Sequence, residues 1–363
     1  MTSSPSSTSV ESIVDDAISP LIYSDTPSAT LTVGAAVGVY IGGTPYFFPF
    51  GVSSIGGSAP TESTLFQIGS VTKVFTTSLL GASPYQQGID AKTFYESNIE
   101  DAVPSAYSLQ SWQQKITYEQ LATFTAGINP STPAQDSDQT QFIQFIDDRP
   151  DPGSLPAAND YSDSSIGLLG QILISAAGIS DYSSSTAADS WYDTNLFSPL
   201  SMSSSGHTPP PNADVATFYK FESGSYDAVP QSPWTPWGTA GRTLSNVSDM
   251  LNFIMANLGV TTINGQSVPS ALTKGMAQAQ AQWTTTSGGA GQGFAWTSYQ
   301  AGGQTMLQKN GGLPGCAAVV ELCPALGFGV VALSNCGSGS PDQMTGALQP
   351  AVGNIMKQLV SLA

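Results

Sequence analysis

The chain is poor in the residues that most enzymes use for acid–base and metal chemistry. It has 363 residues but one histidine, His207, and three cysteines, all near its end. A serine, histidine and aspartate triad is poorly supported, since no Gly-x-Ser-x-Gly segment marks a nucleophile. Cys316, Cys323 and Cys336 lack the spacing of metal ligands, so we expect them to be buried as small apolar side chains. We predict no metal and no cofactor.

Basic residues and long apolar runs are also scarce. Nine lysines and arginines against 26 acidic residues give a net charge of −17, which argues against nucleic acid and against an anionic membrane surface as partners. No run approaches about 18 apolar residues, and residues 1–9 lack the features of a signal peptide. As written, the chain is expected to be cytoplasmic, or secreted if a leader has been removed.

One of the few lysines has a distinctive position. Lys73 follows Ser70 by three residues, and no other basic residue of the chain follows a serine at this distance. On the first turn of a helix, residues i and i+3 share a face, so the ammonium group can lie beside the serine hydroxyl and activate it. The alternative is an exposed lysine on a helix that Ser70 caps.

The flanks of Ser70 favour the catalytic interpretation. An apolar, strand-like run at 64–69 closes on glycine, and residues 74–80 can bury one face of a helix. Ser70 is therefore predicted at a strand-to-helix junction. The unpaired backbone amides of such a first helical turn can stabilise a developing oxyanion.

Two further motifs follow along the chain, Tyr161-Ser162-Asp163 and Lys309-Asn310-Gly311. Their order and approximate spacing after Ser70 are those of an acylating serine hydrolase that works without histidine. The alternatives are that Tyr161 is a tyrosine of the core and that Lys309 is a solvated lysine on a strand.

Apolar patterns predict strands at both ends of the chain with helices between them. Residues 31–41 and 45–50 predict a hairpin. Four more candidate strands imply an antiparallel meander, at 294–299, 304–308, 317–322 and 327–333. Helical patterns lie between the two groups, at 71–80, 117–124, 139–146 and 165–177.

Helices are also expected at the two ends. Ser9 can cap a first helix that ends or kinks at Pro20. A last helix is predicted between Asp342 and Leu362, with a break or restart at Pro350.

The pattern implies an α/β fold of the α+β kind, with one antiparallel sheet flanked by the N- and C-terminal helices. We place the sheet domain at 1–62 and 238–363, and an inserted all-helical domain at 63–237. Within the insert, prolines exclude helix at 209–211 and 229–237 and predict a long aromatic connection.

The three motifs and their flanks resemble the serine β-lactamases of class C and their penicillin-binding and esterase relatives. The resemblance spans about residues 30 to 360 and includes further stretches at 116–127, 161–170, 196–202 and 291–296. It implies the same two-domain fold with the active site in the cleft.

The resemblance also implies a role for each motif residue. Ser70 would be the nucleophile, and Lys73 and Tyr161 would share the proton transfers, either of them being the base. The backbone N–H groups of Ser70 and Gly312 would form the oxyanion hole, and Lys309 would face the site from the edge strand. Two nearby ammonium groups would stabilise the Tyr161 phenolate.

The substrate-binding positions depart from the family pattern. Asp163 stands where the family has asparagine, and an ionised carboxylate cannot donate a hydrogen bond to a substrate amide. It could instead pair with Lys73 or attract a cationic group. Asn310, beside Gly311, replaces a residue with a hydroxyl. The residues that assist carboxylate binding in class C enzymes are replaced by Ser340 and Gln343.

The sequence therefore predicts a metal-free serine hydrolase of the β-lactamase type that forms an acyl-enzyme with a small-molecule lactam, amide or ester. A carboxylesterase, an acyltransferase or a D-amino-acid-type peptidase on the same fold is the alternative. A non-catalytic binding protein that keeps the cleft is a further alternative, because fold does not fix function. The oligomeric state is not predicted.

Overall fold

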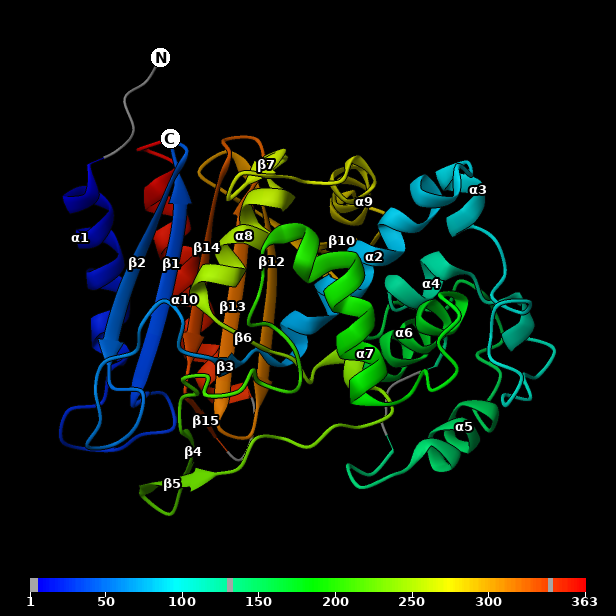
Figure 1. Cartoon of the computed structure of the whole chain (residues 1–363), viewed down its shortest axis with the longest axis horizontal. Coiled ribbons are helices and arrows are strands. Elements are labelled where there is room, and N and C mark those ends of the chain that lie inside the picture. The colour runs from blue at the N-terminus through cyan, green and yellow to red at the C-terminus, as the bar shows by residue number, and fades with distance from the viewer. Residues whose placement is uncertain (1–5, 129–132, 339–341) are drawn as a thin grey trace.

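The computed structural model describes residues 6–128, 133–338 and 342–363. Its central element is an eight-stranded antiparallel sheet with helices on both faces and a mostly helical region at one side (Figure 1). The strands follow the order β2-β1-β14-β13-β12-β11-β10-β9 across the sheet. In chain order they are β1 Gly34–Ile41, β2 Thr44–Gly51, β9 Thr284–Thr285, β10 Gly291–Gln292, β11 Thr297–Ala301, β12 Gln304–Leu313, β13 Cys316–Cys323 and β14 Phe328–Ser334.

The two ends of the chain join in this sheet, as the sequence predicts. β1 lies between β2 and β14, with Ala35 opposite Phe50 on one side and Ser334 on the other. The strands from β11 to β14 form the expected meander. The first helix, α1 (Ser7–Ile18), also lies beside the last, α10 (Asp342–Leu359) (Figure 1).

β1 is buried on both faces because helices cover the sheet from both sides. Val37 and Val39 belong to a core cluster with residues of the two terminal helices, α1 (Ser7–Ile18) and α10 (Asp342–Leu359). Gly38 faces the opposite way, where a Cβ would lie 2.6 Å from the side chain of Val247 at the start of α8 (Val247–Asn257). Alternate residues of β1 thus pack against helices on opposite faces of the sheet.

The inserted region contains most of the remaining helices, which are α2 Thr72–Gln87, α3 Ala91–Tyr95, α4 Tyr118–Ala122, α5 Gln139–Asp147, α6 Asp163–Ala176 and α7 Ser185–Tyr192. α2 packs against α9 (Ser270–Gln280) at two glycines. A Cβ on Gly81 would lie 2.2 Å from the Gly275 carbonyl oxygen, so a side chain at this position would force the two backbones apart.

Short strands also lie in and around the insert. β3 (Phe66–Gln67) pairs with β6 (Leu244–Ser245), which brings the segment before Ser70 beside residues that follow the insert. A hairpin of β4 (Phe218–Glu222) and β5 (Ser225–Val229) pairs with β15 (Cys336–Ser338). A further short pair is formed by β7 Thr262–Ile263 and β8 Gln266–Ser267.

The insert is therefore not purely helical. The prolines predict a connection on both sides of 218–229 but do not predict the hairpin between them. Ser223 and Gly224 both have positive φ, and they form the tight turn that joins β4 to β5.

The predicted starts of two elements differ from the structure. The first helix begins at Ser7, because Ser6 rather than Ser9 is the cap and accepts a hydrogen bond from the Ser9 amide at 3.2 Å. The strand predicted at 294–299 begins only at Thr297, because Ala295 has a φ of 59°, which no strand accommodates.

Pro350 does not break the last helix. α10 continues through it, and Leu348 and Val352 on its two sides are fully buried against the sheet. Packing of this apolar face outweighs the backbone hydrogen bond that proline removes.

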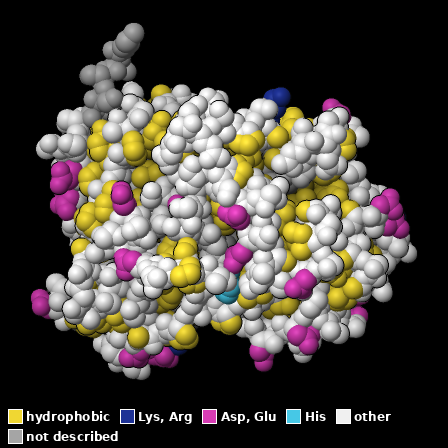
Figure 2. All heavy atoms as spheres, in the orientation of Figure 1, with side chains coloured by type: hydrophobic (Ala, Val, Ile, Leu, Met, Phe, Trp, Pro, Cys, Tyr) yellow, Lys and Arg dark blue, Asp and Glu magenta, His cyan; other side chains and the backbone are white. Residues whose placement is uncertain are grey.

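The surface carries many acidic and few basic side chains on the face shown in Figure 2. No described helix combines the length and apolar character that crossing a membrane requires. The three cysteines are free and buried, as the sequence predicts.

Candidate active site

Ser70 lies on a tight turn between β3 and α2. The 3₁₀ turn η2 (Gly69–Val71) leads directly into α2, which gives the predicted strand-to-helix junction. Gly69 has a φ of +50°, a left-handed conformation that favours glycine. A Cβ at Gly69 would lie 2.7 Å from the backbone nitrogen of Gly312, so the turn and β12 are in close contact.

The end of β12 has one edge that is not paired with β11, and the turn at Ser70 lies against this edge. Its pairing with β11 ends at Gln308, whereas its pairing with β13 continues to Leu313. A Cβ at Gly311 would lie 2.1 Å from the Ile68 carbonyl oxygen and 2.7 Å from the Ser70 nitrogen. The backbone nitrogens of Ser70 and Gly312 therefore both lie at this contact, an arrangement that suits an oxyanion hole.

Lys73 is fully buried one helical turn after Ser70. Its Nζ donates to Ser70 Oγ at 2.9 Å and to Asp163 Oδ1 at 2.5 Å. A third hydrogen bond goes to the carbonyl oxygen of Ala240 at 2.7 Å. Burial opposes the charge of Lys73, but the Asp163 carboxylate and Tyr161 outweigh it, and its pKa is raised above the ordinary lysine value. Lys73 is therefore an ammonium ion with three acceptors.

Asp163 is the first residue of α6. Ser162 caps this helix by accepting from the Ser165 amide at 3.0 Å, and a carboxylate in the first turn is stabilised by the helix dipole. The Asp163 side chain is 38% exposed and forms the ion pair with Lys73. Burial raises its pKa, but Lys73, with Lys309 and Arg242 further away, outweighs burial, so its pKa is below the ordinary value. The sequence left two roles open for Asp163, pairing with Lys73 or attracting a cationic group. In the structure Asp163 pairs with Lys73.

Tyr161 lies between two lysines at the surface of the site, with 45% of the residue exposed. Lys309 Nζ lies 3.3 Å from its hydroxyl, and Lys73 Nζ lies 4.8 Å from the ring centroid. Phe124 packs against the ring at 4.9 Å between centroids. Burial of the hydroxyl opposes ionisation, but the two ammonium groups outweigh it and lower the pKa of Tyr161. The two ammonium groups therefore make the Tyr161 phenolate easier to form.

Lys309 is buried on β12, opposite Val320 of β13. Burial lowers the pKa of its ammonium group, and Lys73 acts in the same direction, while Tyr161 raises it. Its ammonium group is therefore held mainly by Tyr161, which it contacts directly.

Asn310 and Gly311 line a cavity of about 300 Å³ together with Ser70, Tyr161 and Asp163. The Asn310 side chain donates to Gln349 of α10 at 2.6 Å, so its amide is already held by the protein. Thr345 of α10 completes the cavity and was not singled out from the sequence. Gln343 is exposed and lines neither cavity beside Ser70, and Ser340 lies outside the described residues.

A second cavity of about 390 Å³ also opens on Ser70, Asp163 and Gly312. Arg242 and Trp237 line it, and both follow the region of the first two motifs by many residues. Arg242 and the Ala240 carbonyl that holds Lys73 were not predicted from the sequence. The signal that could have identified Arg242 is the scarcity of arginine, since Arg242 and Arg149 are the two arginines of the chain.

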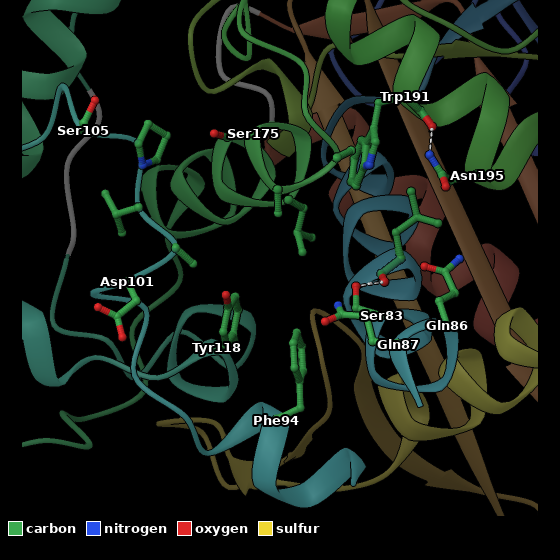
Figure 3. A pocket seen from close by; sticks show the side chains of 17 residues that line it. Ser83, Gln86, Gln87, Phe94, Asp101, Ser105, Tyr118, Ser175, Trp191 and Asn195 are labelled. Atoms are coloured by element: carbon green, nitrogen blue, oxygen red, sulfur yellow. Dashed lines mark hydrogen bonds between the residues drawn. The ribbon is translucent and has the colours of Figure 1, made fainter. Parts of the chain in front are cut away.

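A larger cavity of about 620 Å³ lies elsewhere, at the far end of α2 among helices of the insert (Figure 3). Phe94 and Tyr118 stack beside it with their ring centroids 4.8 Å apart. Among the described residues that line it, Asp101 is the only charged one, and no serine lies beside a lysine or histidine. Size alone therefore does not identify the catalytic cavity.

The described residues contain no cluster of histidine, cysteine or carboxylate side chains that could hold a metal ion. His207 lies in a loop, where Nδ1 is 2.8 Å from the carbonyl oxygen of Arg242. It lines neither of the cavities beside Ser70.

A protein-family model described as Beta-lactamase matches residues 25–352 of the chain. A beta-lactamase of Escherichia coli K12 is 28% identical over 292 residues, which cover 79% of this chain and 70% of the relative. A beta-lactamase of Yersinia enterocolitica is 27% identical over 301 residues, which cover 80% of this chain and 69% of the relative.

Solved structures of the same kind share the fold. A class C beta-lactamase from Rhodobacter sphaeroides superposes with a TM-score of 0.77 at 22% identity, covering 98% of this chain and 100% of that chain. A beta-lactamase from Sulfitobacter sp. EE-36 gives a TM-score of 0.79 at 22% identity, covering 99% and 100%. The predicted fold class is confirmed.

Proposed function

Because the chain belongs to the beta-lactamase family, which makes it a serine hydrolase, we propose that Ser70 is its nucleophile and forms an acyl-enzyme with a small-molecule substrate. The site then lies in a cleft between a sheet domain at 1–62 and 238–363 and an inserted domain at 63–237. Lys73, Tyr161 and Lys309 supply the charges around the nucleophile.

The hydrogen bonds of Lys73 support Tyr161 as the base. An ammonium group has three N–H donors and no acceptor, and the acceptors of Lys73 are Ser70, Asp163 and the Ala240 carbonyl. It therefore has no lone pair with which to take the Ser70 proton. Tyr161, whose pKa is lowered by Lys309 and Lys73, is the group that can accept it.

The proposed reaction has two halves. The Ser70 oxygen attacks the substrate carbonyl carbon while its proton passes to Tyr161, and the resulting oxyanion is bound by the N–H groups of Ser70 and Gly312. As the bond to the leaving group breaks, Tyr161 returns the proton to the leaving atom. Water then attacks the acyl-enzyme and gives a proton to Tyr161, which returns it to Ser70 as the acid departs.

Asp163 favours esters over lactams and amides as substrates. It is ionised and held by Lys73, so it cannot donate a hydrogen bond to a substrate amide carbonyl. Asn310 is likewise engaged with Gln349. A simple ester has no side-chain amide that would need either donor. Its one carbonyl oxygen, the reacting one, is bound in the oxyanion hole.

The test is a burst-phase assay with p-nitrophenyl acetate beside nitrocefin, followed by mass spectrometry of the acylated protein. The wild type is expected to show an acetyl adduct on Ser70 and little turnover of nitrocefin. Ser70→Ala should lose at least roughly a thousandfold in ester turnover. Ser83→Ala, on the same helix and outside both cavities beside Ser70, should react like the wild type.

Asp163→Asn tests the substrate preference. The introduced amide can donate to a lactam side-chain carbonyl, so nitrocefin turnover should rise while ester turnover falls with the loss of the Lys73 partner. A wild-type protein that forms no adduct at Ser70 with any activated ester would contradict the proposal. Tight reversible binding that Ser70→Ala leaves unchanged would instead identify a non-catalytic binding protein.

A further inference from the structure

One more cation lies beside the proposed nucleophile, outside the three motifs. Arg242 follows the turn η6 (Gly238–Ala240) and lines the 390 Å³ cavity that opens on Ser70. The residue is only 8% exposed. It is one of only two arginines in a chain with nine basic residues.

The hydrogen bonds of Arg242 are incomplete. A guanidinium group has five N–H donors. Nη2 donates to the side chain of Gln135, an exposed residue at the rim of the same cavity. Nε is buried and has no hydrogen-bond partner among the described residues. A buried donor without an acceptor is costly, so the protein does not supply the guanidinium group with a complete set of partners.

The two cavities beside Ser70 have different linings, which indicates how a substrate lies. Tyr161 and Asn310 line only the 300 Å³ cavity, whereas Arg242 and Trp237 line only the 390 Å³ cavity. The leaving group must reach Tyr161 to receive its proton. The remainder of the acyl group then lies in the second cavity, beside Arg242; this assignment depends on the proposed function.

Charge and shape define what the second cavity accepts. Asp163 and Arg242 are the charged residues among the described lining of this cavity, and Asp163 is already paired with Lys73. Arg242 is therefore its charged group without an ion-pair partner among the described residues, in a chain whose net charge is −17. Trp237, Leu313 and Pro314 give the cavity apolar walls.

We infer that Arg242 binds a carboxylate at the far end of the acyl group, so that the preferred substrates are monoesters of dicarboxylic acids with a short apolar spacer. A guanidinium group matches the planar geometry of a carboxylate, and the apolar walls suit a chain of methylene groups.

The experiment compares p-nitrophenyl monoesters of glutaric and adipic acid with the p-nitrophenyl esters of pentanoic and hexanoic acid, each corrected for its spontaneous hydrolysis. The wild type is expected to prefer the acidic ester of the fitting length by roughly tenfold or more in kcat/KM. Arg242→Gln should lose most of this preference, whereas Arg242→Lys should keep part of it. Arg149→Gln, which removes the other arginine, should keep the full preference.

The ratio of acidic to neutral ester is a measurement that a purely structural role of Arg242 would not change. Equal kcat/KM for the two classes, with an adduct on Ser70 from both, would overturn the inference and leave the proposed function standing. A preference that survives in Arg242→Gln would also overturn it. Absence of any Ser70 adduct would instead refute the proposed function.

A second measurement covers the case in which Arg242→Gln does not fold, as judged by circular dichroism. The p-nitrophenyl ester of adipamic acid has the length of the adipate ester but ends in a neutral amide. The wild type should hydrolyse the adipate ester roughly tenfold faster. Equal rates for the two esters would overturn the inference without any variant.

Discussion

Glu321 is a buried carboxyl group that the proposed reaction does not use. It is 1% exposed on β13, and Tyr299 donates to its Oε2 at 2.5 Å. Burial raises its pKa from the ordinary value to about 7, although Tyr299 and Lys357 oppose this shift. Folding therefore favours the protonated form of this residue.

The raised pKa predicts a loss of stability with increasing pH. Between the unfolded value of 4.5 and about 7, the unfolded chain releases the Glu321 proton while the folded chain retains it. The free energy of unfolding should fall across this range by up to roughly 3 kcal/mol and then stay constant with respect to this group. Glu321→Gln should match the wild type at about pH 4.5 and exceed it in stability at about pH 8.

Urea unfolding of both proteins at the two pH values measures this difference. Glu11→Gln, on the exposed face of α1, is the matched control and should show the same small difference at both values. A Glu321→Gln variant that is no more stable than the wild type at the higher pH would contradict the prediction.

The sequence identifies single residues of the site when their signal is local. Ser70 and Lys73 can be related through helical spacing, and the structure places the two side chains 2.9 Å apart. The Ala240 carbonyl and Arg242 carry no such signal. They are brought to the site by contacts between segments far apart in the sequence, among them the pairing of β3 with β6.

At the scale of elements, the contact between β12 and the Ser70 turn fixes the site. Gly311 permits it, since a Cβ there would lie 2.1 Å from the Ile68 carbonyl oxygen. Gly311→Ala should therefore move β12 away and separate the N–H groups of Ser70 and Gly312. We expect ester turnover to fall by roughly a hundredfold or more and stability to fall by about 1–3 kcal/mol.

Gly346→Ala is the matched control for this change. Gly346 lies inside α10, and a Cβ there would meet no atom within 4 Å. The variant should keep its ester turnover and gain roughly 0.5–1 kcal/mol in stability, because glycine is unfavourable within a helix. Wild-type kcat/KM in Gly311→Ala would show that the contact does not position the oxyanion hole.

Elements with strong apolar patterns are predictable from the sequence, and their ends are not. The strands of the meander are present because alternating and continuous apolar runs identify buried strands. Pro350 shows why local rules fail at boundaries, since burial of Leu348 and Val352 holds α10 together across it. The β4 and β5 hairpin is short and depends on its pairing with β15, which the local sequence does not show.

At the scale of the whole molecule, charge is distributed unevenly. Three of the nine basic residues, Lys73, Lys309 and Arg242, are buried at the site. The chain has six other basic residues and 26 acidic residues, and many of the acidic side chains lie at the surface (Figure 2). The outer surface is therefore dominated by negative charge, while the site itself is positive.

This distribution predicts that salt stabilises the protein near neutral pH. The ion pairs of the described residues are Lys73–Asp163, whose lysine is fully buried, and the two surface pairs Lys92–Glu96 and Lys220–Glu222. Screening removes little attraction from so few surface pairs, but it weakens the repulsion among the many carboxylates. Raising NaCl from about 10 to about 200 mM should therefore increase the midpoint of thermal unfolding at about pH 7.

The same salt series at about pH 4, near the sequence pI of 4.1, is the control. There the net charge is close to zero, so the repulsion that salt relieves is small and the midpoint should change much less. An equal increase at both pH values would show a general salt effect on solvation rather than screening of the surface carboxylates. A decrease at neutral pH would show that attractive pairs dominate the surface, contrary to the distribution of charges in the structure.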